Sequence, residues 1–336
     1  MLSMWERTRR TAAFLASDPV ARARIGETPA EIVFRQGPAS VRHIAPATVR
    51  HAPVFISMPL INTWHIWDLR PGMSVIEALR DAGVPVYLLD WGRPAAHDAE
   101  RTLAECIDGT LRRSIMRVRR HAQERYDTEA LDAIGYCVGG TFLAIALARH
   151  PGLARRAAFV ATPIDFHASG RLATWAGPEF PVDALIDGLG NFPGSLMRTS
   201  FAWLDPKSQS RKWVTLWERL HLDDFPQTWA AIEKWATDGV DFPGEAYREY
   251  VRRCYMDNAL IAGGWMLDGT PVDLSNATIP ALVLAASRDH IAPPAACNGL
   301  SGAWGGPVTE GSLRGGHVGI CVQPALPAAL LDWLGA

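Results

Sequence analysis

The sequence lacks the features that mark disulfide-stapled, membrane-spanning or nucleic-acid-binding proteins. Its cysteines are odd in number and far apart, unlike those of disulfide frameworks and zinc sites, which favours a reducing compartment: Cys106, Cys137, Cys254, Cys297 and Cys321. No run of about 18 uninterrupted apolar residues occurs, so no membrane-spanning helix is predicted. Lysine and arginine number 33 against 35 acidic residues, so overall charge gives no case for nucleic-acid binding. The apolar stretch TAAFLA after Arg10 is too short for a signal peptide, and we expect a cytoplasmic protein.

What the sequence does contain is a regular alternation of strand and helix patterns in a chain of 336 residues, enough for a large core. We expect an antiparallel hairpin at 31–36 and 40–45, followed by short strands at 54–58, 86–90, 132–136, 159–162, 281–287 and 308–313. Helical patterns separate the strands, at 74–82, 103–125, 139–150 and 325–334. This order predicts an α/β fold with a mostly parallel, doubly wound sheet.

The segment 165–277 interrupts the alternation with helical patterns and no convincing strand, so we expect a helical cap inserted into a core formed by 1–164 and 278–336. Seven of the thirteen tryptophans fall in this segment, which two interpretations explain. Trp213, Trp217 and Leu220 have helical spacing and would bury together as ordinary packing. Alternatively, the tryptophans form a roof that excludes water from an apolar acyl site.

A candidate nucleophile lies where a predicted strand meets a predicted helix. The stretch GYCVGG places Cys137 between Gly135 and Gly139. In a nucleophile elbow the residues two positions before and after the nucleophile must be small, and both glycines meet this requirement. The helix N-terminus would also lower the pKa of the thiol and offer backbone N–H groups to an oxyanion. The alternative is a cysteine that is merely a small buried residue.

Two further residues complete a candidate triad. Asp289 and His317 follow the two late strands, in loops at their carboxyl ends. The chain order nucleophile, acid, histidine is that of α/β-hydrolases and not of other triad folds. His317 would deprotonate Cys137, and Asp289 would orient the imidazole or act on a second proton. His290 is a rival for the histidine, but the preceding glycines free the loop of His317 to reach the site.

The oxyanion hole is expected from backbone N–H groups, one on Val138 and one on Ile61 or Asn62. No cofactor and no metal are expected. Attack of a cysteine thiolate on a thioester gives a second thioester, which keeps the acyl group activated for an alcohol and suits transfer from coenzyme A. A cysteine hydrolase acting on esters, lactones or thioesters remains open.

Eight collinear stretches carry a family resemblance over nearly the whole chain: PLINTWHIWDLRPG (59–72), VYLLDWGRP (86–94), GYCVGGT (135–141), TPIDFHASG (162–170), LGNFPGSLM (189–197), GEAYREY (244–250), SRDHIAPP (287–294) and GGHVGI (315–320). The sequence resembles the polyhydroxyalkanoate synthases, which have an α/β-hydrolase fold, and within them the class III catalytic subunit. By motif, Cys137 corresponds to the family's nucleophile and His317 to its general base. Asp289 corresponds to the carboxylate that helps activate the 3-hydroxyl.

The resemblance implies a cytoplasmic acyltransferase that joins (R)-3-hydroxyacyl groups from coenzyme A into a polyester at granule surfaces. It also implies a homodimer and, for class III, a second non-catalytic subunit. Val138 differs from the Gln of class III subunits, which leaves the subunit class open. A non-catalytic granule-associated relative is the remaining alternative. The basic stretch 111–125 either meets the phosphates of coenzyme A or forms a solvated helix face.

Overall fold

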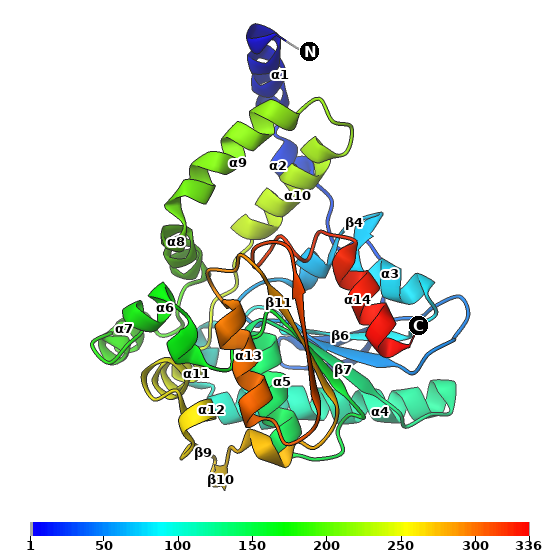
Figure 1. Ribbon diagram of the computed structural model, residues 1–336, viewed down its shortest axis with the longest axis vertical. Coiled ribbons are helices and arrows are strands. Elements are labelled where there is room, and N and C mark those ends of the chain that lie inside the picture. Colours follow the sequence, from blue (N-terminus) through cyan, green and yellow to red (C-terminus); the bar gives the residue numbers. More distant parts are fainter. Residues whose placement is uncertain (1–2, 336) are drawn as a thin grey trace.

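The computed structural model describes residues 3–335 and is built on one eight-stranded sheet (Figure 1). Its strands, in spatial order, are β1 (Glu31–Gln36), β2 (Ala39–Ile44), β6 (Val86–Asp90), β3 (Val54–Ser57), β7 (Asp132–Tyr136), β8 (Ala157–Val160), β11 (Ala281–Ala286) and β12 (Val308–Leu313). The pairs β1–β2 and β2–β6 are antiparallel, and all other neighbours are parallel. The predicted hairpin and the predicted mostly parallel, doubly wound sheet are both confirmed.

Helices cover both faces of the sheet, which is why its central strands are mostly apolar. On one face α3 (Val75–Asp81) packs against α14 (Ala325–Leu334), and α5 (Val138–Arg149) and α13 (Pro294–Ala303) lie on the other (Figure 1). Every residue of β3, β7, β8 and β11 is buried. Burial of this apolar surface is the main source of stability for the sheet.

Two elements differ in detail from the pattern-based expectation. The fourth parallel strand was expected at 159–162, whereas β8 is Ala157–Val160, because Ala157 and Ala158 pair with both neighbouring strands despite their low strand propensity. The helix expected at 103–125 contains a π-helical stretch, η3 (Glu105–Leu111), before α4 (Arg112–Tyr126). Smaller elements fill the connections: η1 (Trp64–Trp67), β4 (Asp68–Arg70), β5 (Met73–Ser74) and η2 (Ala96–Glu100).

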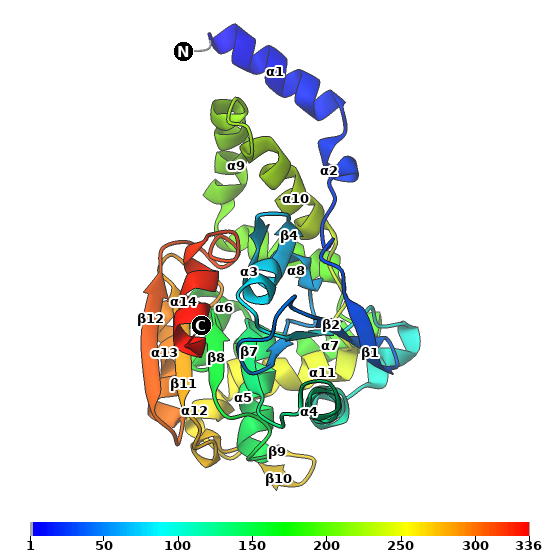
Figure 2. The same cartoon turned by 90° about the vertical axis from the view of Figure 1, so that its right-hand side faces the viewer.

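The segment 165–277 is almost wholly helical. It contains η4 (Phe166–Ala168), α6 (Arg171–Trp175), α7 (Val182–Leu189), α8 (Gly194–Leu204), α9 (Pro206–Arg219), α10 (Phe225–Thr237), α11 (Gly244–Tyr250), η5 (Val251–Met256), α12 (Ala259–Ala262) and η6 (Leu274–Asn276). Its only described strands, the short pair β9 (Met266–Leu267) and β10 (Thr270–Pro271), do not join the large sheet. Helices α9 and α10 protrude from the body, and α1 (Met4–Ala16) and α2 (Pro19–Arg22) pack against them (Figure 2).

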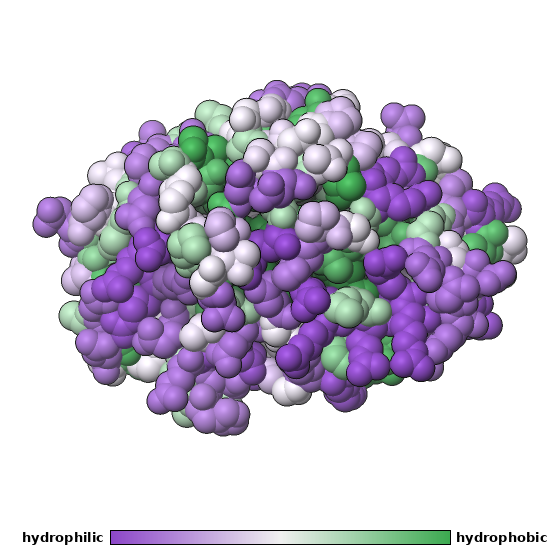
Figure 3. All heavy atoms as spheres, turned by 90° about the horizontal axis from the view of Figure 1, so that it is seen from below, coloured by the Kyte–Doolittle hydropathy of each residue, from purple (hydrophilic) through white to green (hydrophobic). Residues whose placement is uncertain are grey.

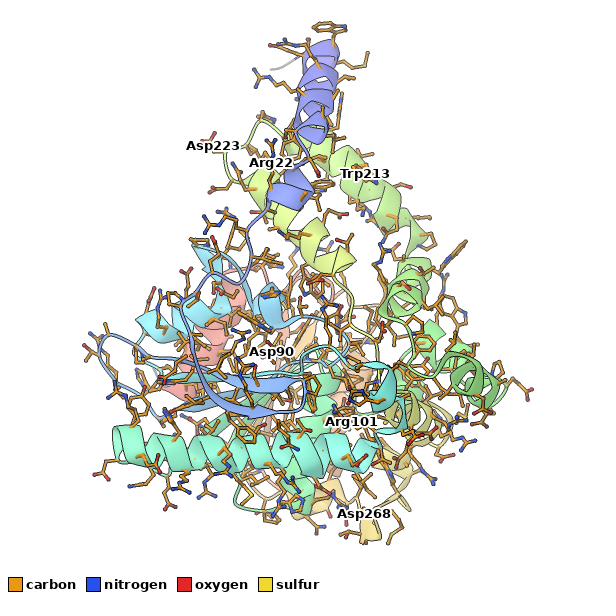
Figure 4. The ribbon with its side chains drawn as sticks, turned by 180° about the vertical axis from the view of Figure 1, so that it is seen from behind. Arg22, Asp90, Arg101, Trp213, Asp223 and Asp268 are labelled. Carbon is orange, nitrogen blue, oxygen red and sulfur yellow. The ribbon has the colours of Figure 1, made fainter. Side chains whose placement is uncertain are left out.

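The protruding helices have a small core of their own. Leu216, Trp229 and Ala230 are buried there, and Phe14 from α1 packs against them. The expectation that Trp213 would bury with its helical neighbours is wrong: its side chain is 47% exposed, because Leu216 occupies the centre of the buried face of α9. Trp213 lies in the protruding part of the molecule, together with Arg22 and Asp223, whereas Asp268 lies at the opposite end (Figure 4).

Among residues 3–335, no helix combines the length and the apolar character needed to cross a membrane.

Candidate active site

Three parallel strands end at one edge of the sheet and carry the three predicted triad residues. Cys137 directly follows β7, Asp289 follows β11 after a short turn, and His317 lies in the loop after β12. Because parallel strands present their carboxyl ends at the same edge, residues distant in sequence meet there. The structure brings all three together: Nδ1 of His317 lies 2.6 Å from Oδ2 of Asp289, and Cys137 is near enough to raise the pKa of His317.

The turn that carries Cys137 is strained and tightly packed. Cys137 has φ 52° and ψ −136°, a conformation that L-residues rarely adopt and that costs about 1–3 kcal/mol. A Cβ atom on Gly135 would lie 2.3 Å from the Cα of Gly140, and one on Gly139 would lie 2.4 Å from the carbonyl oxygen of Met58. The requirement for small residues on both sides of the turn is therefore confirmed. The thiol is only 8% exposed.

Asp289 holds the imidazole of His317 in place. Its Oδ2 lies 2.6 Å from Nδ1 of His317. Its Oδ1 accepts hydrogen bonds from the backbone N–H groups of Ile291 at 2.8 Å and Ala292 at 2.9 Å. The Asp289 side chain is completely buried. Because both carboxylate oxygens are engaged, its geometry suits orientation of the histidine better than contact with a substrate.

The protonation of His317 is governed by its two acidic neighbours. Burial lowers its pKa, but the charges of Asp289 and Cys137, with hydrogen bonds to both, raise the pKa well above its ordinary value. A carbonyl contact also fixes the histidine: the Tyr136 hydroxyl donates to the backbone oxygen of His317 at 3.1 Å, and the two rings are stacked with centroids 5.3 Å apart. A raised pKa makes the imidazole of His317 a stronger base.

The rival histidine lies outside this arrangement. The side chain of His290 is 62% exposed, and its Nε2 is 3.9 Å from a carboxylate oxygen of Asp205. It does not line the cavity that contains Cys137. The geometry therefore selects His317 from the two candidates.

The oxyanion hole was expected from Val138 and from either Ile61 or Asn62, and these last two residues line different cavities. Val138 is the first residue of α5, so its N–H lacks an acceptor within the helix. Ile61 lines the same cavity as Cys137 and Val138, whereas Asn62 lines a separate cavity. The carbonyl of Ile61 accepts the N–H of Val240 at 3.2 Å, which fixes this loop. Ile61 is the better placed of the two candidates.

Cys137 lies in an apolar cavity of about 280 Å³. Most of the cavity wall comes from residues of the segment 165–277. Apart from Ser200, the remaining residues of the wall are aromatic and aliphatic: Pro163, Leu172, Trp175, Ala176, Phe180, Leu185, Phe192, Leu196, Met197, Phe201, Phe242, Tyr247, Tyr250, Val251, Tyr255 and Ile291. Two signals in the sequence pointed to some of them: the collinear motifs contain several, and Trp175 is one of the tryptophans interpreted as a roof.

The basic stretch at 111–125 does not contribute to this cavity. Arg119 donates to the carbonyl of Gly152 and pairs with Glu129, and Arg120 pairs with Glu124. These local partners support the interpretation of a solvated helix face.

In the described part of the chain, no group of three or more His, Cys, Asp and Glu side chains is arranged to hold a metal ion.

The fold is that of the α/β-hydrolases, with Cys137 in the turn between β7 and α5. The family model for the alpha/beta hydrolase fold matches residues 61–317. Among solved structures, a thermostable carboxyl esterase from Bacillus coagulans is similar with a TM-score of 0.57 at 14% identity, over 91% of this chain and 97% of the esterase. A protein from Mycobacterium tuberculosis is similar with a TM-score of 0.54 at 18% identity, over 90% of this chain and 95% of that one. These likenesses concern the fold alone.

Relatives identified by sequence show which family within the α/β-hydrolase fold contains this chain. The poly(3-hydroxyalkanoate) polymerase subunit PhaC of Allochromatium vinosum is 33% identical over 84% of this chain and 80% of the relative. The same subunit of Thiocystis violacea is 31% identical over 92% of this chain and 88% of the relative. That of Haloferax mediterranei is 31% identical over 97% of this chain and 67% of the relative. The chain belongs to the poly(3-hydroxyalkanoate) polymerase family.

Proposed function

We propose that this protein is a polyhydroxyalkanoate synthase, an acyltransferase that polymerises (R)-3-hydroxyacyl-CoA through an acyl group carried on Cys137. Membership of the polymerase family supports the reaction. One structural observation carries the assignment of residues: the paired His317 and Asp289 meet Cys137 at the inner end of an apolar cavity.

Acylation is the first step. His317 takes the proton of the Cys137 thiol, and the thiolate attacks the carbonyl carbon of the acyl-CoA thioester. A new C–S bond forms to Cys137, the C–S bond to coenzyme A breaks, and the departing coenzyme A sulfur receives the proton from His317. Asp289 holds the imidazole through Nδ1, so the other ring nitrogen faces the reacting sulfur.

The tetrahedral intermediate of this step carries a negative oxygen. The backbone N–H groups of Val138 and Ile61 are our proposed donors to that oxygen. The N-terminus of α5 adds a favourable dipole at the same point. Ser57 supports the arrangement, because its hydroxyl donates to the carbonyl of Gly139 at 2.8 Å and joins β3 to this helix.

Elongation is the second step. The 3-hydroxyl of an incoming acyl-CoA loses its proton to His317 and attacks the acyl carbon on Cys137. An ester C–O bond forms, the C–S bond to Cys137 breaks, and the thiolate regains the proton. The lengthened chain, now a thioester of coenzyme A, acylates Cys137 again. An apolar wall disfavours water as a competing acceptor.

The wider organisation follows from family membership and is likewise proposed. The relatives named above are subunits of a polymerase, which supports a second, non-catalytic subunit for this chain. A homodimer, a cytoplasmic location and attachment to the polyester granule complete the proposal. We further propose that 165–277 is a cap over the catalytic core, since it supplies most of the cavity wall.

Trapping of the acyl-enzyme tests the assignment of the nucleophile. The protein is mixed with (R)-3-hydroxybutyryl-CoA, quenched in acid, digested and examined by mass spectrometry. We expect a 3-hydroxybutyryl adduct on Cys137, no adduct in Cys137→Ala, and an unchanged adduct in the control Cys106→Ala, whose thiol is buried outside the cavity. An adduct on another residue would contradict the proposal.

A further inference from the structure

The cavity around Cys137 runs from a buried inner end to an exposed outer end. At the inner end, Cys137 is 8% and Val138 2% exposed. At the outer end, Trp175 of α6 and Leu196 of α8 line the same cavity but are 42% and 43% exposed. The cavity therefore opens to the surface between α6 and α8, and its opening has an apolar rim, here defined as Trp175 and Leu196.

The chemistry of the wall limits what can pass through this opening. Of the residues described, those that line the cavity include no charged side chain, and the few polar side-chain groups are the hydroxyls of Ser200 and three tyrosines and the indole N–H of Trp175, apart from the thiol itself. Coenzyme A carries several phosphate charges, which require cationic partners or water. A polyester is uncharged and contains apolar carbon groups with ester carbonyls that only accept hydrogen bonds. An apolar wall with a few hydroxyl donors fits the polyester and not coenzyme A.

The volume of the cavity also indicates a growing polyester as its occupant. At about 280 Å³ the cavity lies at or just below the lower end of the usual range for small-molecule pockets, about 300–1,000 Å³. A chain of many units cannot remain inside while its end is attached to Cys137. The polyester must leave the cavity while it grows, past side chains with which it makes favourable apolar contacts.

The surface around the opening continues its apolar character. Large apolar side chains are also exposed on α7 and α8, two helices that line the cavity: Leu189 and Trp203. The lower face of the molecule, by contrast, is covered mostly by hydrophilic side chains (Figure 3). Exposed apolar groups that gather in one region mark a binding surface more often than scattered ones do.

We propose that the opening rimmed by Trp175 and Leu196 is the exit port of the growing polyester and binds its most recently added units. This inference rests on the proposed synthase activity. Contact with the rim keeps the chain threaded between additions, so the rim sets the length that the polymer reaches. The first acylation needs only the inner end of the cavity.

Substitutions at the rim test this proposal. Trp175→Ser and Leu196→Ser each remove an exposed apolar side chain, so a large loss of stability is not expected. Trp5→Ser is the matched control, because Trp5 lies on α1, is 73% exposed and does not line the cavity. Each protein is supplied with (R)-3-hydroxybutyryl-CoA, the first burst of coenzyme A release is timed, and the molar mass of the polymer is measured by size-exclusion chromatography.

We expect each rim variant to lower the mean polymer length about threefold more than it lowers the rate of the first coenzyme A release, with a larger effect in the double variant. The control should match the wild type in both. Unchanged polymer length in the rim variants would overturn the exit port. A raised KM for the acyl-CoA with unchanged length would overturn it too, since the opening would then admit substrate. Wild-type protein that releases only free acid would instead overturn the synthase activity, and the exit port with it.

Discussion

Substitution of Asp289 by asparagine isolates the electrostatic part of the site. The variant keeps an oxygen that can accept the N–H groups of Ile291 and Ala292, so the loop is preserved. It removes the negative charge 2.6 Å from Nδ1 of His317. Since that charge raises the pKa of His317, the variant has a lower pKa there and a less stable imidazolium.

The size of the effect can be bounded from the geometry. A hydrogen bond to a charged group contributes about 1.5–3 kcal/mol, which sets a lower bound of about tenfold in the acylation rate. Coulomb's law at this separation of 2.6 Å with a dielectric constant of about 20 gives about 6 kcal/mol, an upper bound of about 50,000-fold. We therefore expect acylation of Cys137 to slow by between about tenfold and about 50,000-fold.

Single-turnover release of coenzyme A from (R)-3-hydroxybutyryl-CoA measures this rate. Asp132→Asn provides the control, because Asp132 is also a buried aspartate but lies at the start of β7, about 16 Å along the strand from Cys137. The control should lose stability, through its contacts with Arg155 and Arg156, but keep its rate per folded molecule. Acylation by Asp289→Asn at the wild-type rate would refute the role given to this carboxylate.

Two further predictions concern stability. Gly139→Ala would force a Cβ to within 2.4 Å of the Met58 oxygen and should lower the free energy of unfolding, measured in urea, by about 1–3 kcal/mol. The control Gly188→Ala, on α7 with open space around it, should be neutral or stabilising. Equal effects of the two substitutions would contradict this packing argument. Burial, and then the charges of His121 and Arg125, lower the pKa of His43 from 6.5 to about 4, so the unfolded chain takes up the proton first as the pH falls. The free energy of unfolding should then drop by at most about 3 kcal/mol between pH 6.5 and pH 4. The part of this drop that disappears in His43→Phe is the contribution of His43. A variant with an unchanged pH dependence would show that His43 contributes nothing.

Much of the fold could be predicted because its strands are short apolar runs with few alternatives. The positions of β12 and α14 match their sequence patterns residue for residue. The shift of β8 toward Ala157 could not be read locally, since alanine favours helices and only pairing with two neighbours makes it a strand. The exposure of Trp213 was also hidden, because helical spacing shows which residues share a face but not which of them is at its centre.

The candidate site, like the fold, could be predicted only in part from the sequence. Cys137, Asp289 and His317 each follow a strand that the sequence makes visible, so their meeting at one edge of the sheet follows from topology. The choice between Ile61 and Asn62 required the path of the loop in space. The cavity wall required the packing of the helices in 165–277, which places Trp175 and Tyr255 in the wall of the same cavity although 80 residues separate them.

The most direct test of the central claim is the product formed from (R)-3-hydroxybutyryl-CoA, analysed as polymer or free acid in the wild type and in Cys137→Ala. If no coenzyme A is released by the wild type alone, the assay is repeated with a candidate second subunit. The account predicts polymer with equivalent release of coenzyme A, and neither product in the variant, whose fold should persist because one small buried side chain is removed. Free acid alone, or polymer made by Cys137→Ala at the wild-type rate, would contradict it.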